Sequence, residues 1–358
     1  MGIIAGMYFK HMRNADVSDA VNVSCLQERI ALFADTLAAD VGVAAIFDNR
    51  DTLVYCNSVH DSFPMMSVMK FHQALAVCAW LRETGRTLDT VMEVKPDDLH
   101  ENTWSPLRDS YPDGGKFSWR ELLEYTLGSS DNNVCDILFK CIGGPDAVDR
   151  YVRSLGIDDF AIECTEAMMH EDLSCCDRNW TTPLSAVRLL EEFRRTKDKD
   201  EYSEFIWNTM AGCRTGQGRI PGGIPDTGVA GDCDKEEIGR GDGDDGDVIG
   251  YREWGVDEGE VGCGECDADD EEEIGRGDVD RNRVGDEDGD RNGETTVVHK
   301  TGTGDLGPDG RIIAVNDIGT VVLPDGGYFS IAVFVSDASC SIQECEAVIA
   351  HITRMVYD

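Results

Sequence analysis

The sequence predicts an α+β fold, with an antiparallel five-stranded sheet flanked by helices and an all-helical lobe beside it. Two observations predict this class: strand patterns occur near both ends of the 358-residue chain, and helical patterns fill much of its middle. Strands near both ends with helices between them imply one antiparallel sheet to which both ends contribute. About 290 residues outside one acidic segment are ample for a sizeable core.

Hydrophobic periodicity places the elements in chain order. A helix is expected at residues 27–39, followed by a hairpin at residues 41–47 and 52–55 with Asn49-Arg50-Asp51 in its turn. Helical patterns then fill much of residues 67–196. Three more strands are expected at residues 295–299, 311–323 and 328–335, and a final helix at residues 341–357.

An acidic segment at residues 227–294 interrupts this order. It is dominated by Gly, Asp and Glu, and it carries 26 acidic and 7 basic residues, which is half of the net charge of −38. Such a composition buries too little apolar surface to offset the entropy cost of ordering, so we expect disorder. We therefore divide the chain into a tail at residues 1–20, one folded domain at residues 21–226 and 295–358, and this insertion. The helical lobe is expected at about residues 63–208.

Three short motifs occur in an informative order. They are Ser67-Val68-Met69-Lys70, Ser130-Asp131-Asn132 and Lys300-Thr301-Gly302, with Glu166 between the second and the third. Each string alone is weak evidence. Together they predict a serine acyl-transfer site, because this set is the signature of class A β-lactamases and penicillin-binding proteins.

The chemistry explains why these residue types are needed. A serine hydroxyl is a poor nucleophile at its ordinary pKa and requires an adjacent base. If a helix begins at Ser67, Lys70 lies one turn further on the same face. The start of that helix also supplies free backbone N–H groups and a positive dipole end close to the nucleophile.

The domain resembles the class A serine β-lactamases, and more closely the branch that includes the CfxA, PER and VEB cephalosporinases. The segments that carry the resemblance are residues 64–70, 125–133, 179–183, 299–302 and 352–357. The resemblance implies the β-lactamase/transpeptidase-like fold, a catalytic role for the folded domain, and hydrolysis of β-lactams, both cephalosporins and penicillins.

The resemblance also implies residue roles. Ser67 is expected to be the acylated nucleophile, Lys70 its hydrogen-bonded partner, and Ser130 the proton donor to the lactam nitrogen. Glu166 is expected to activate the water that releases the acyl-enzyme. Whether Lys70 or Glu166 is the base for acylation stays open at this stage.

A further set is expected to bind the substrate: Asn132, Lys300, Thr301, Gly302, Thr303, Arg219, Trp104 and His170. Asn132 would hold the acylamide side chain, and Lys300 with Thr301 would meet the carboxylate. The backbone N–H groups of Ser67 and Thr303 would form the oxyanion hole. Arg219 would be a second carboxylate anchor, because a guanidinium binds a carboxylate in bidentate fashion.

Two departures from the family pattern concern the loop that carries Glu166. An arginine–aspartate pair commonly clamps the neck of this loop, and the matching residues here are Cys164 and Asn179. Asp136 stands where other members often carry asparagine. If Asp136 is buried, it must be hydrogen-bonded, to loop backbone or to Asn179. We interpret both changes as an enlarged site that accepts bulky oxyimino-cephalosporins.

Composition limits the partners that we expect. A pI near 4.3 argues against nucleic acid and anionic membranes, and no stretch is long enough to span a bilayer. Incomplete EF-hand and zinc-like spacings at residues 288–293 and 263–266 lack required ligands, so we expect no metal and no cofactor. Fourteen cysteines permit disulfides, without indicating a pairing. We expect a monomer.

The location and two alternative functions stay open. Residues 1–7 lack an apolar signal core, so a periplasmic or secreted location rests on the resemblance alone. One alternative is a penicillin-binding transpeptidase or carboxypeptidase, for which Glu166 would be dispensable. The other is a non-catalytic relative whose acidic insertion binds cations or a basic partner.

Overall fold

The computed structural model describes residues 23–48, 51–225 and 294–358. The tail at residues 1–20, residues 227–293 of the insertion and the turn residues Asn49 and Arg50 lie outside this part of the chain. The strands are β1 (Asp40–Phe47), β2 (Asp51–Cys56), β3 (Phe63–Pro64), β4 (Val91–Val94), β5 (Gly115–Ser118), β6 (Phe160–Ala161), β7 (Trp180–Thr181), β8 (Thr296–Thr303), β9 (Ile312–Val322) and β10 (Tyr328–Ala338).

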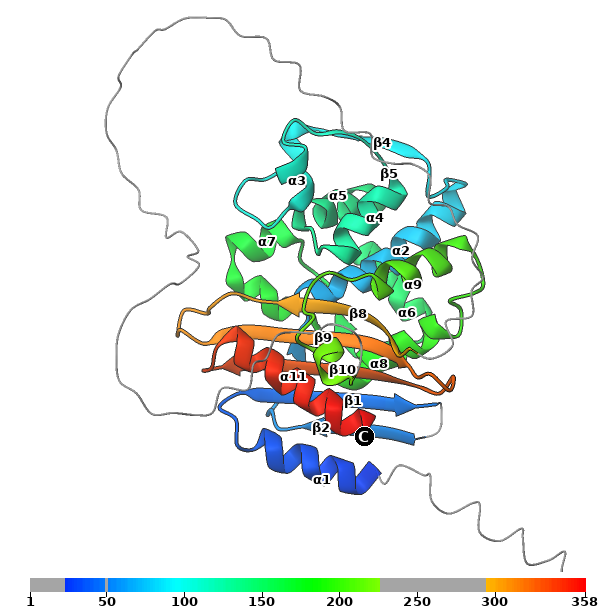
Figure 1. Cartoon of the computed structure of the whole chain (residues 1–358). Coiled ribbons are helices and arrows are strands. Elements are labelled where there is room, and N and C mark those ends of the chain that lie inside the picture. Colours follow the sequence, from blue (N-terminus) through cyan, green and yellow to red (C-terminus); the bar gives the residue numbers. More distant parts are fainter. Residues whose placement is uncertain (1–22, 49–50, 226–293) are drawn as a thin grey trace, which may run out of the picture. The chain divides into compact units, whose positions relative to one another are not determined.

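The helices complete the description (Figure 1). The α-helices are α1 (Val23–Ala34), α2 (Met69–Thr84), α3 (Pro106–Ser110), α4 (Trp119–Gly128), α5 (Asn132–Ile142), α6 (Pro145–Ser154), α7 (Glu166–Glu171), α8 (Pro183–Arg194), α9 (Glu201–Ala211), α10 (Ile220–Gly223) and α11 (Ile342–Tyr357). Three short 3₁₀ turns are η1 (Met66–Val68), η2 (Pro96–Asp98) and η3 (Leu173–Arg178).

The main sheet confirms the predicted fold class. Its strand order is β2-β1-β10-β9-β8, so the first two strands of the chain join the last three. Every neighbouring pair is antiparallel. β8 is an edge strand in this order, and it carries the third sequence motif.

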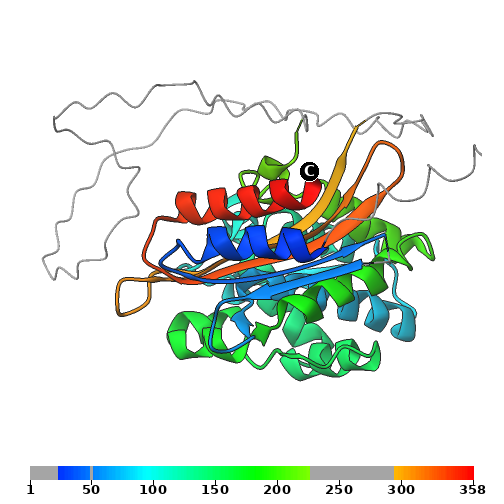
Figure 2. The ribbon, with the colours of Figure 1, turned by 90° about the horizontal axis from the view of Figure 1, so that it is seen from below.

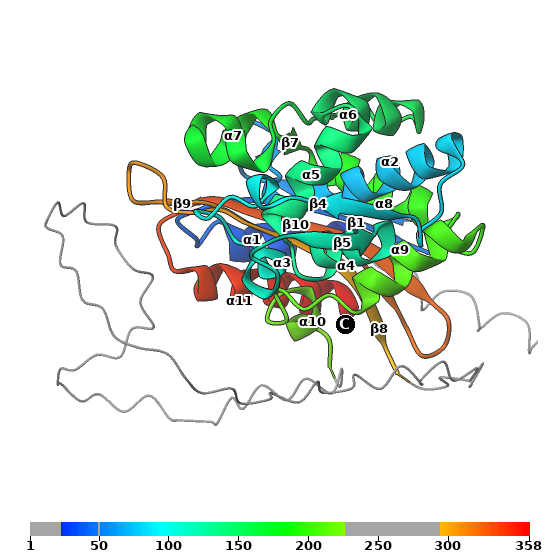
Figure 3. The ribbon, with the colours of Figure 1, turned by 90° about the horizontal axis from the view of Figure 1, so that it is seen from above.

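Both faces of this sheet are covered, which explains why its strands are almost continuously apolar. Val43 and Ala45 of β1 pack with α1 and α11 on one face (Figure 2). Ala44, which points the opposite way, belongs to the core of the helical lobe on the other face (Figure 3). This alternation is the period of two that a strand imposes on its side chains.

Helix α2 is the central helix of the lobe, and it carries Lys70, the second catalytic candidate, in a buried position. Eleven of its sixteen residues are buried, among them the polar Lys70, His72 and Gln73. The helix ends at Gly85, whose φ of 67° is the left-handed conformation that closes many helices. A fully buried lysine on such a helix requires polar partners.

Several element boundaries differ from the prediction. The first helix includes residues from Val23 onward, and not only from residue 27. The first helix ends at Ala34 and not at residue 39, because Thr36 and Leu37 donate to the carbonyls of Phe33 and Ala34 in a tightened last turn. β8 continues to Thr303, since residues Lys300 to Thr303 pair in register with β9. The Lys-Thr-Gly motif is therefore itself part of the edge strand.

Candidate active site

Ser67 lies in the 3₁₀ turn η1, which continues directly into α2. Lys70 follows one turn later, and its Nζ donates to Ser67 Oγ over 2.9 Å. Met66, just before the serine, has a φ of 48°, which is uncommon for a residue with a side chain. Such strain costs about 1–3 kcal/mol and persists only where the surroundings enforce it, as they do at functional sites.

The Lys70 ammonium is the centre of the site. Besides Ser67 Oγ, it lies 2.8 Å from the Ser130 carbonyl, 2.5 Å from Asn132 Oδ1 and 2.9 Å from Glu166 Oε1. Ser130 Oγ is a fifth acceptor at 3.4 Å. An ammonium group has only three N–H donors, so these oxygens compete for its protons. Lys70 thus connects the Ser67 hydroxyl to the Glu166 carboxylate within hydrogen-bond distance, which is the contact that a proton relay requires.

Ser130 reaches Lys70 because the loop before α5 is held rigidly. Its φ of 59° is again in the left-handed region. The next residue, Asp131, is fully buried; its carboxylate caps α5 by accepting from the Val134 N–H, and it also accepts from Ser105 and from the Leu107 N–H. These bonds tie the second motif to the loop before α3.

Strand β8 brings the third motif against the serine. Lys300 Nζ donates to Ser130 Oγ over 3.1 Å, so this hydroxyl lies between two lysines. A Cβ at Gly302 would lie 2.5 Å from the Met65 carbonyl oxygen, so only glycine permits this approach. Burial lowers the pKa of Lys300 to about 8, and the nearby Lys70 acts in the same direction.

Asp136 is partly buried, and its partner is loop backbone, one of the two partners that the sequence led us to expect; it makes no bond to Asn179 in the described part of the chain. Its two carboxylate oxygens accept from the backbone N–H groups of Glu166 and Ala167, over 2.7 and 2.8 Å. Burial raises the pKa of Asp136 to about 6, and the charge of Glu166 adds to this rise. The first turn of α7, and with it Glu166, is thus fastened to α5 by a carboxylate.

Asn179 holds the neck of the loop in place of an ion pair. Its Oδ1 accepts from the N–H groups of Glu163 and Cys164, and its Nδ2 donates to the Cys164 carbonyl over 2.9 Å. The side chain is fully buried. The predicted absence of the arginine–aspartate clamp is therefore accompanied by a neutral amide clamp on the backbone, which residue types alone do not reveal.

Two adjoining cavities open onto these residues. One, of about 90 Å³, is lined by Ser67, Thr303 and Met169 among others. The other, of about 310 Å³, lies between the loop around Asn102 and helix α7. Both are lined by Thr103, Asn132, Glu166 and His170. His170 thus lines both cavities, and its role in substrate binding stays a prediction.

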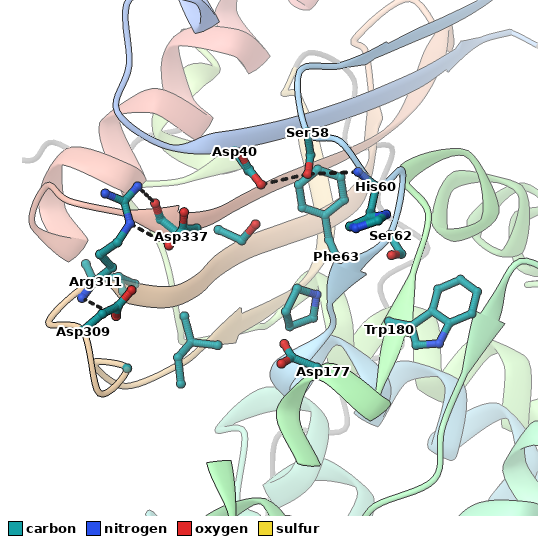
Figure 4. Close-up of a pocket in the computed structure, with 15 residues that line it drawn as sticks. Asp40, Ser58, His60, Ser62, Phe63, Asp177, Trp180, Asp309, Arg311 and Asp337 are labelled. Carbon is teal, nitrogen blue, oxygen red and sulfur yellow. Dashed lines mark hydrogen bonds and ion pairs between the residues drawn. The ribbon is translucent and has the colours of Figure 1, made fainter. Parts of the chain in front are cut away.

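A larger cavity of about 380 Å³ has a different lining (Figure 4) and shares Ile313 with the smaller cavity at Ser67. None of the predicted site residues lines it. Several of its polar groups are paired with each other: Arg311 Nε lies 2.6 Å from Asp337 Oδ1, and Ser58 donates to Asp40 over 2.8 Å. We therefore do not assign the reaction to this cavity.

A family model for the β-lactamase enzyme family matches residues 26–240, which is more than half of the chain. The chain belongs to the β-lactamase enzyme family. A β-lactamase of Bacteroides uniformis is 32% identical to it over 351 residues, covering 96% of this chain and 94% of that one. The β-lactamase VEB-1 of Pseudomonas aeruginosa is 29% identical over 325 residues, covering 89% and 85%.

Solved structures agree with these relatives. The crystal structure of the TLA-3 extended-spectrum β-lactamase is 32% identical, with a TM-score of 0.73, and the match covers 94% of this chain and 98% of that one. A class A β-lactamase from Bacteroides cellulosilyticus has a TM-score of 0.70 at 32% identity, covering 94% and 96%. The chain is accordingly a class A serine β-lactamase, an enzyme that hydrolyses β-lactams, as predicted.

The structure places Arg219 of this β-lactamase behind the edge strand. Four of its five N–H groups donate to protein oxygens: Glu346 Oε1, the carbonyls of Gly302 and Asn316, and Thr303 Oγ1 at 2.7 Å. A bidentate grip on a substrate carboxylate would require it to release some of them. Arg219 reaches the site through the Thr303 hydroxyl, which retains its own proton for donation.

Trp104 stands beside the second motif, and two threonines supplement the predicted site. The Trp104 ring is 60% exposed, and its indole N–H donates to the Ser129 carbonyl. Thr103 accepts from Asn132 Nδ2 over 2.8 Å, and Thr215 lies 2.6 Å from Thr301, hydroxyl to hydroxyl. Sequence reasoning missed both threonines, because neither belongs to a motif.

None of the described helices is both long and apolar enough to cross a bilayer.

Proposed function

We propose that this β-lactamase acts through a Ser67 acyl-enzyme that water, activated by Glu166, hydrolyses. The observation that carries the proposal is the position of Lys70 Nζ, 2.9 Å from both Ser67 Oγ and Glu166 Oε1. A lysine that contacts nucleophile and carboxylate together relays a proton between them. This geometry serves acylation whether Lys70 or Glu166 is the final base.

We assign to Ser130 the protonation of the leaving nitrogen when the ring opens. Its hydroxyl lies 3.4 Å from Lys70 Nζ and 3.1 Å from Lys300 Nζ. Two neighbouring ammonium groups stabilise the alkoxide character that develops as Ser130 gives its proton away. Lys70 then supplies the replacement proton.

The substrate carboxylate is assigned to the edge strand. Lys300 supplies the positive charge there, Thr301 and Thr303 supply hydroxyls, and Gly302 allows the close approach. The N–H groups of Ser67 and Thr303 are assigned to the oxyanion hole, because both residues line the same cavity. Asn132 is assigned to the acylamide group.

The cavity between Asn102 and α7 supports a preference for substrates with bulky side chains. It adjoins Asn132, so an acylamide group held there extends into about 310 Å³ of space. We therefore propose oxyimino-cephalosporins as substrates beside small penicillins, with His170 and Trp104 at the rim. Comparable turnover of a ceftazidime-like and a small penicillin substrate is expected. No turnover of any oxyimino substrate would contradict this assignment.

Hydrolysis of a chromogenic cephalosporin by purified protein, run beside Glu166→Ala, tests the mechanism. We expect steady turnover by the wild type and accumulation of an acyl-enzyme at Ser67 in the variant, seen by intact mass. A stoichiometric burst that stalls in both proteins would instead favour a penicillin-binding protein. No acylation of folded wild type would favour the non-catalytic alternative.

We further infer a monomer that is exported from the cytoplasm and binds no nucleic acid. The pI near 4.3 supports the last point. Size-exclusion chromatography with light scattering measures the oligomeric state, and fractionation of expressing cells measures the location.

A further inference from the structure

A line of polar side chains, all buried except the partly buried Thr215, runs behind the edge strand. His299 Nδ1 lies 3.0 Å from both carboxylate oxygens of Asp317, and the Cys213 thiol is an electrostatic neighbour of the same imidazole. Cys213 Sγ lies 3.4 Å from Thr215 Oγ1, and this hydroxyl lies 2.6 Å from Thr301 Oγ1. The line thus ends at a residue of the carboxylate-binding strand.

These side chains are sealed from solvent. Cys213, His299 and Asp317 are 6%, 2% and 0% exposed, and Lys300, the neighbour of His299 in β8, is 0% exposed. Asp317 also accepts from the Ile220 N–H, which fixes its position. Charges in such surroundings must balance, because water does not screen them.

The ionisation of Cys213 decides that balance. With Asp317 negative and Lys300 positive, protonation of His299 gives these three buried side chains one excess positive charge. A neutral Cys213 thiol leaves this excess in place, whereas a thiolate removes it. We propose that Cys213 is a positioning residue: as a thiolate paired with the His299 imidazolium, it keeps Lys300 protonated and the Lys-Thr-Gly strand arranged for the substrate carboxylate. This inference rests on the proposed role of Lys300.

The surroundings of each group support this ionisation. Burial raises the pKa of Cys213, but the hydrogen bond and charge of His299, and the charge of Lys300, outweigh burial and lower it to about 7. Burial lowers the pKa of His299, but Asp317 and Cys213 outweigh it and raise it to about 10. Every other cysteine with a shifted pKa in the described ranges is raised.

Four charged groups act on Lys300 from the elements around it. Cys213, Asp317 and Glu166 favour its protonated form, whereas Lys70 opposes it. Among the three favourable groups, Cys213 has the largest effect. Removing the thiolate therefore lowers the pKa of Lys300 further, and each unit reduces its protonated fraction about tenfold at higher pH.

The test is the pH profile of kcat/KM for a carboxylate-bearing β-lactam, measured on the full chain. The variants are Cys213→Ala, Cys213→Ser and Cys213→Asp, with Cys78→Ala as a matched control. Cys78 is equally buried, but burial raises the pKa of its thiol to about 12, so it stays neutral. The control is expected to follow the wild-type profile.

We expect Cys213→Ala and Cys213→Ser to approach wild-type kcat/KM near pH 6 and to fall about tenfold below it near pH 9, mainly through KM. Cys213→Asp restores a negative charge and should remove this pH dependence. If the alanine variant does not fold, the serine variant, which keeps the volume and stays neutral, gives the same comparison.

A ratio to wild type that does not change with pH, in both the alanine and serine variants, would overturn the inference, because a purely structural role predicts that result. Failure of the proposed function is distinguishable from this outcome. In that case wild-type protein itself forms no Ser67 acyl-enzyme, whatever residue stands at position 213.

Discussion

The substitution Asp136→Asn is expected to displace Glu166 while it leaves the unfolding free energy of the protein nearly unchanged. Asp136 accepts from the Glu166 and Ala167 N–H groups, one with each oxygen. Asparagine is isosteric but has a single acceptor oxygen, so its NH₂ group faces one of these donors. Helix α7 then loses one of its two bonds to α5, and Glu166 shifts.

Two opposing energies predict that stability changes little. The rise of the Asp136 pKa from 3.8 to about 6 corresponds to about 3 kcal/mol of unfolding free energy lost at neutral pH. Asparagine removes this cost, whereas the lost hydrogen bond to a charged acceptor costs about 1.5–3 kcal/mol. The two nearly cancel. The deacylation rate should nevertheless fall, because a displacement of about 1 Å in a catalytic group slows a reaction by about a hundredfold.

The assay combines intact mass during turnover with thermal denaturation. We expect Asp136→Asn to accumulate acyl-enzyme at a nearly unchanged melting temperature near pH 7. Because the folded pKa of Asp136 is raised, its contribution to stability is present below pH 3.8 and is lost as pH rises through about 6. The wild type should therefore gain stability relative to the variant between pH 7 and pH 4. A variant that deacylates at the wild-type rate would refute this reasoning. So would a stability difference between wild type and variant that does not change with pH.

Two further substitutions test the loop neck and the edge strand. Asn179→Leu removes three hydrogen bonds to the backbone of Glu163 and Cys164 and should lower the unfolding free energy by about 2–5 kcal/mol. Urea denaturation measures this change, with Asn208→Leu as a control on an exposed helix face. An unchanged denaturation midpoint would contradict the amide clamp. Thr303→Val removes the hydroxyl that Arg219 donates to and should raise KM about fivefold with little change in kcat, whereas Thr303→Ser should restore KM. A kcat loss with constant KM would contradict a ground-state contact.

The sheet was predictable because strands that are buried on both faces are almost continuously apolar in sequence. Residues 41–47, 311–323 and 328–335 are apolar enough to be predicted as strands without knowledge of their partners. The candidate catalytic residues could be named for another reason: acyl transfer demands particular side chains at fixed spacing on a helix or strand. Ser67 and Lys70 meet that demand locally, within one helical turn.

Residues that act across elements were not predictable in this way. Asn179 resembles any loop asparagine, and its role depends on Glu163 and Cys164 approaching from the other end of the loop. His299 and Asp317 meet only because β8 and β9 pair in one register, with Thr301 opposite Asp317. No spacing along the chain indicates either contact, since both arise from tertiary pairing.

The two lysines of the site have to be considered together. Lys70 and Lys300 both lie within hydrogen-bonding distance of the Ser130 hydroxyl, and the charge of Lys70 helps to lower the pKa of Lys300. Glu166 balances Lys70 directly, whereas Asp317, through His299 and Cys213, balances Lys300 from behind the strand. Neutralising Glu166 therefore affects carboxylate binding as well as deacylation, because it also removes a charge that favours protonated Lys300. The effects of Glu166→Gln and Cys213→Ser on KM should consequently be non-additive near pH 8, as expected for groups that share one buried charge balance.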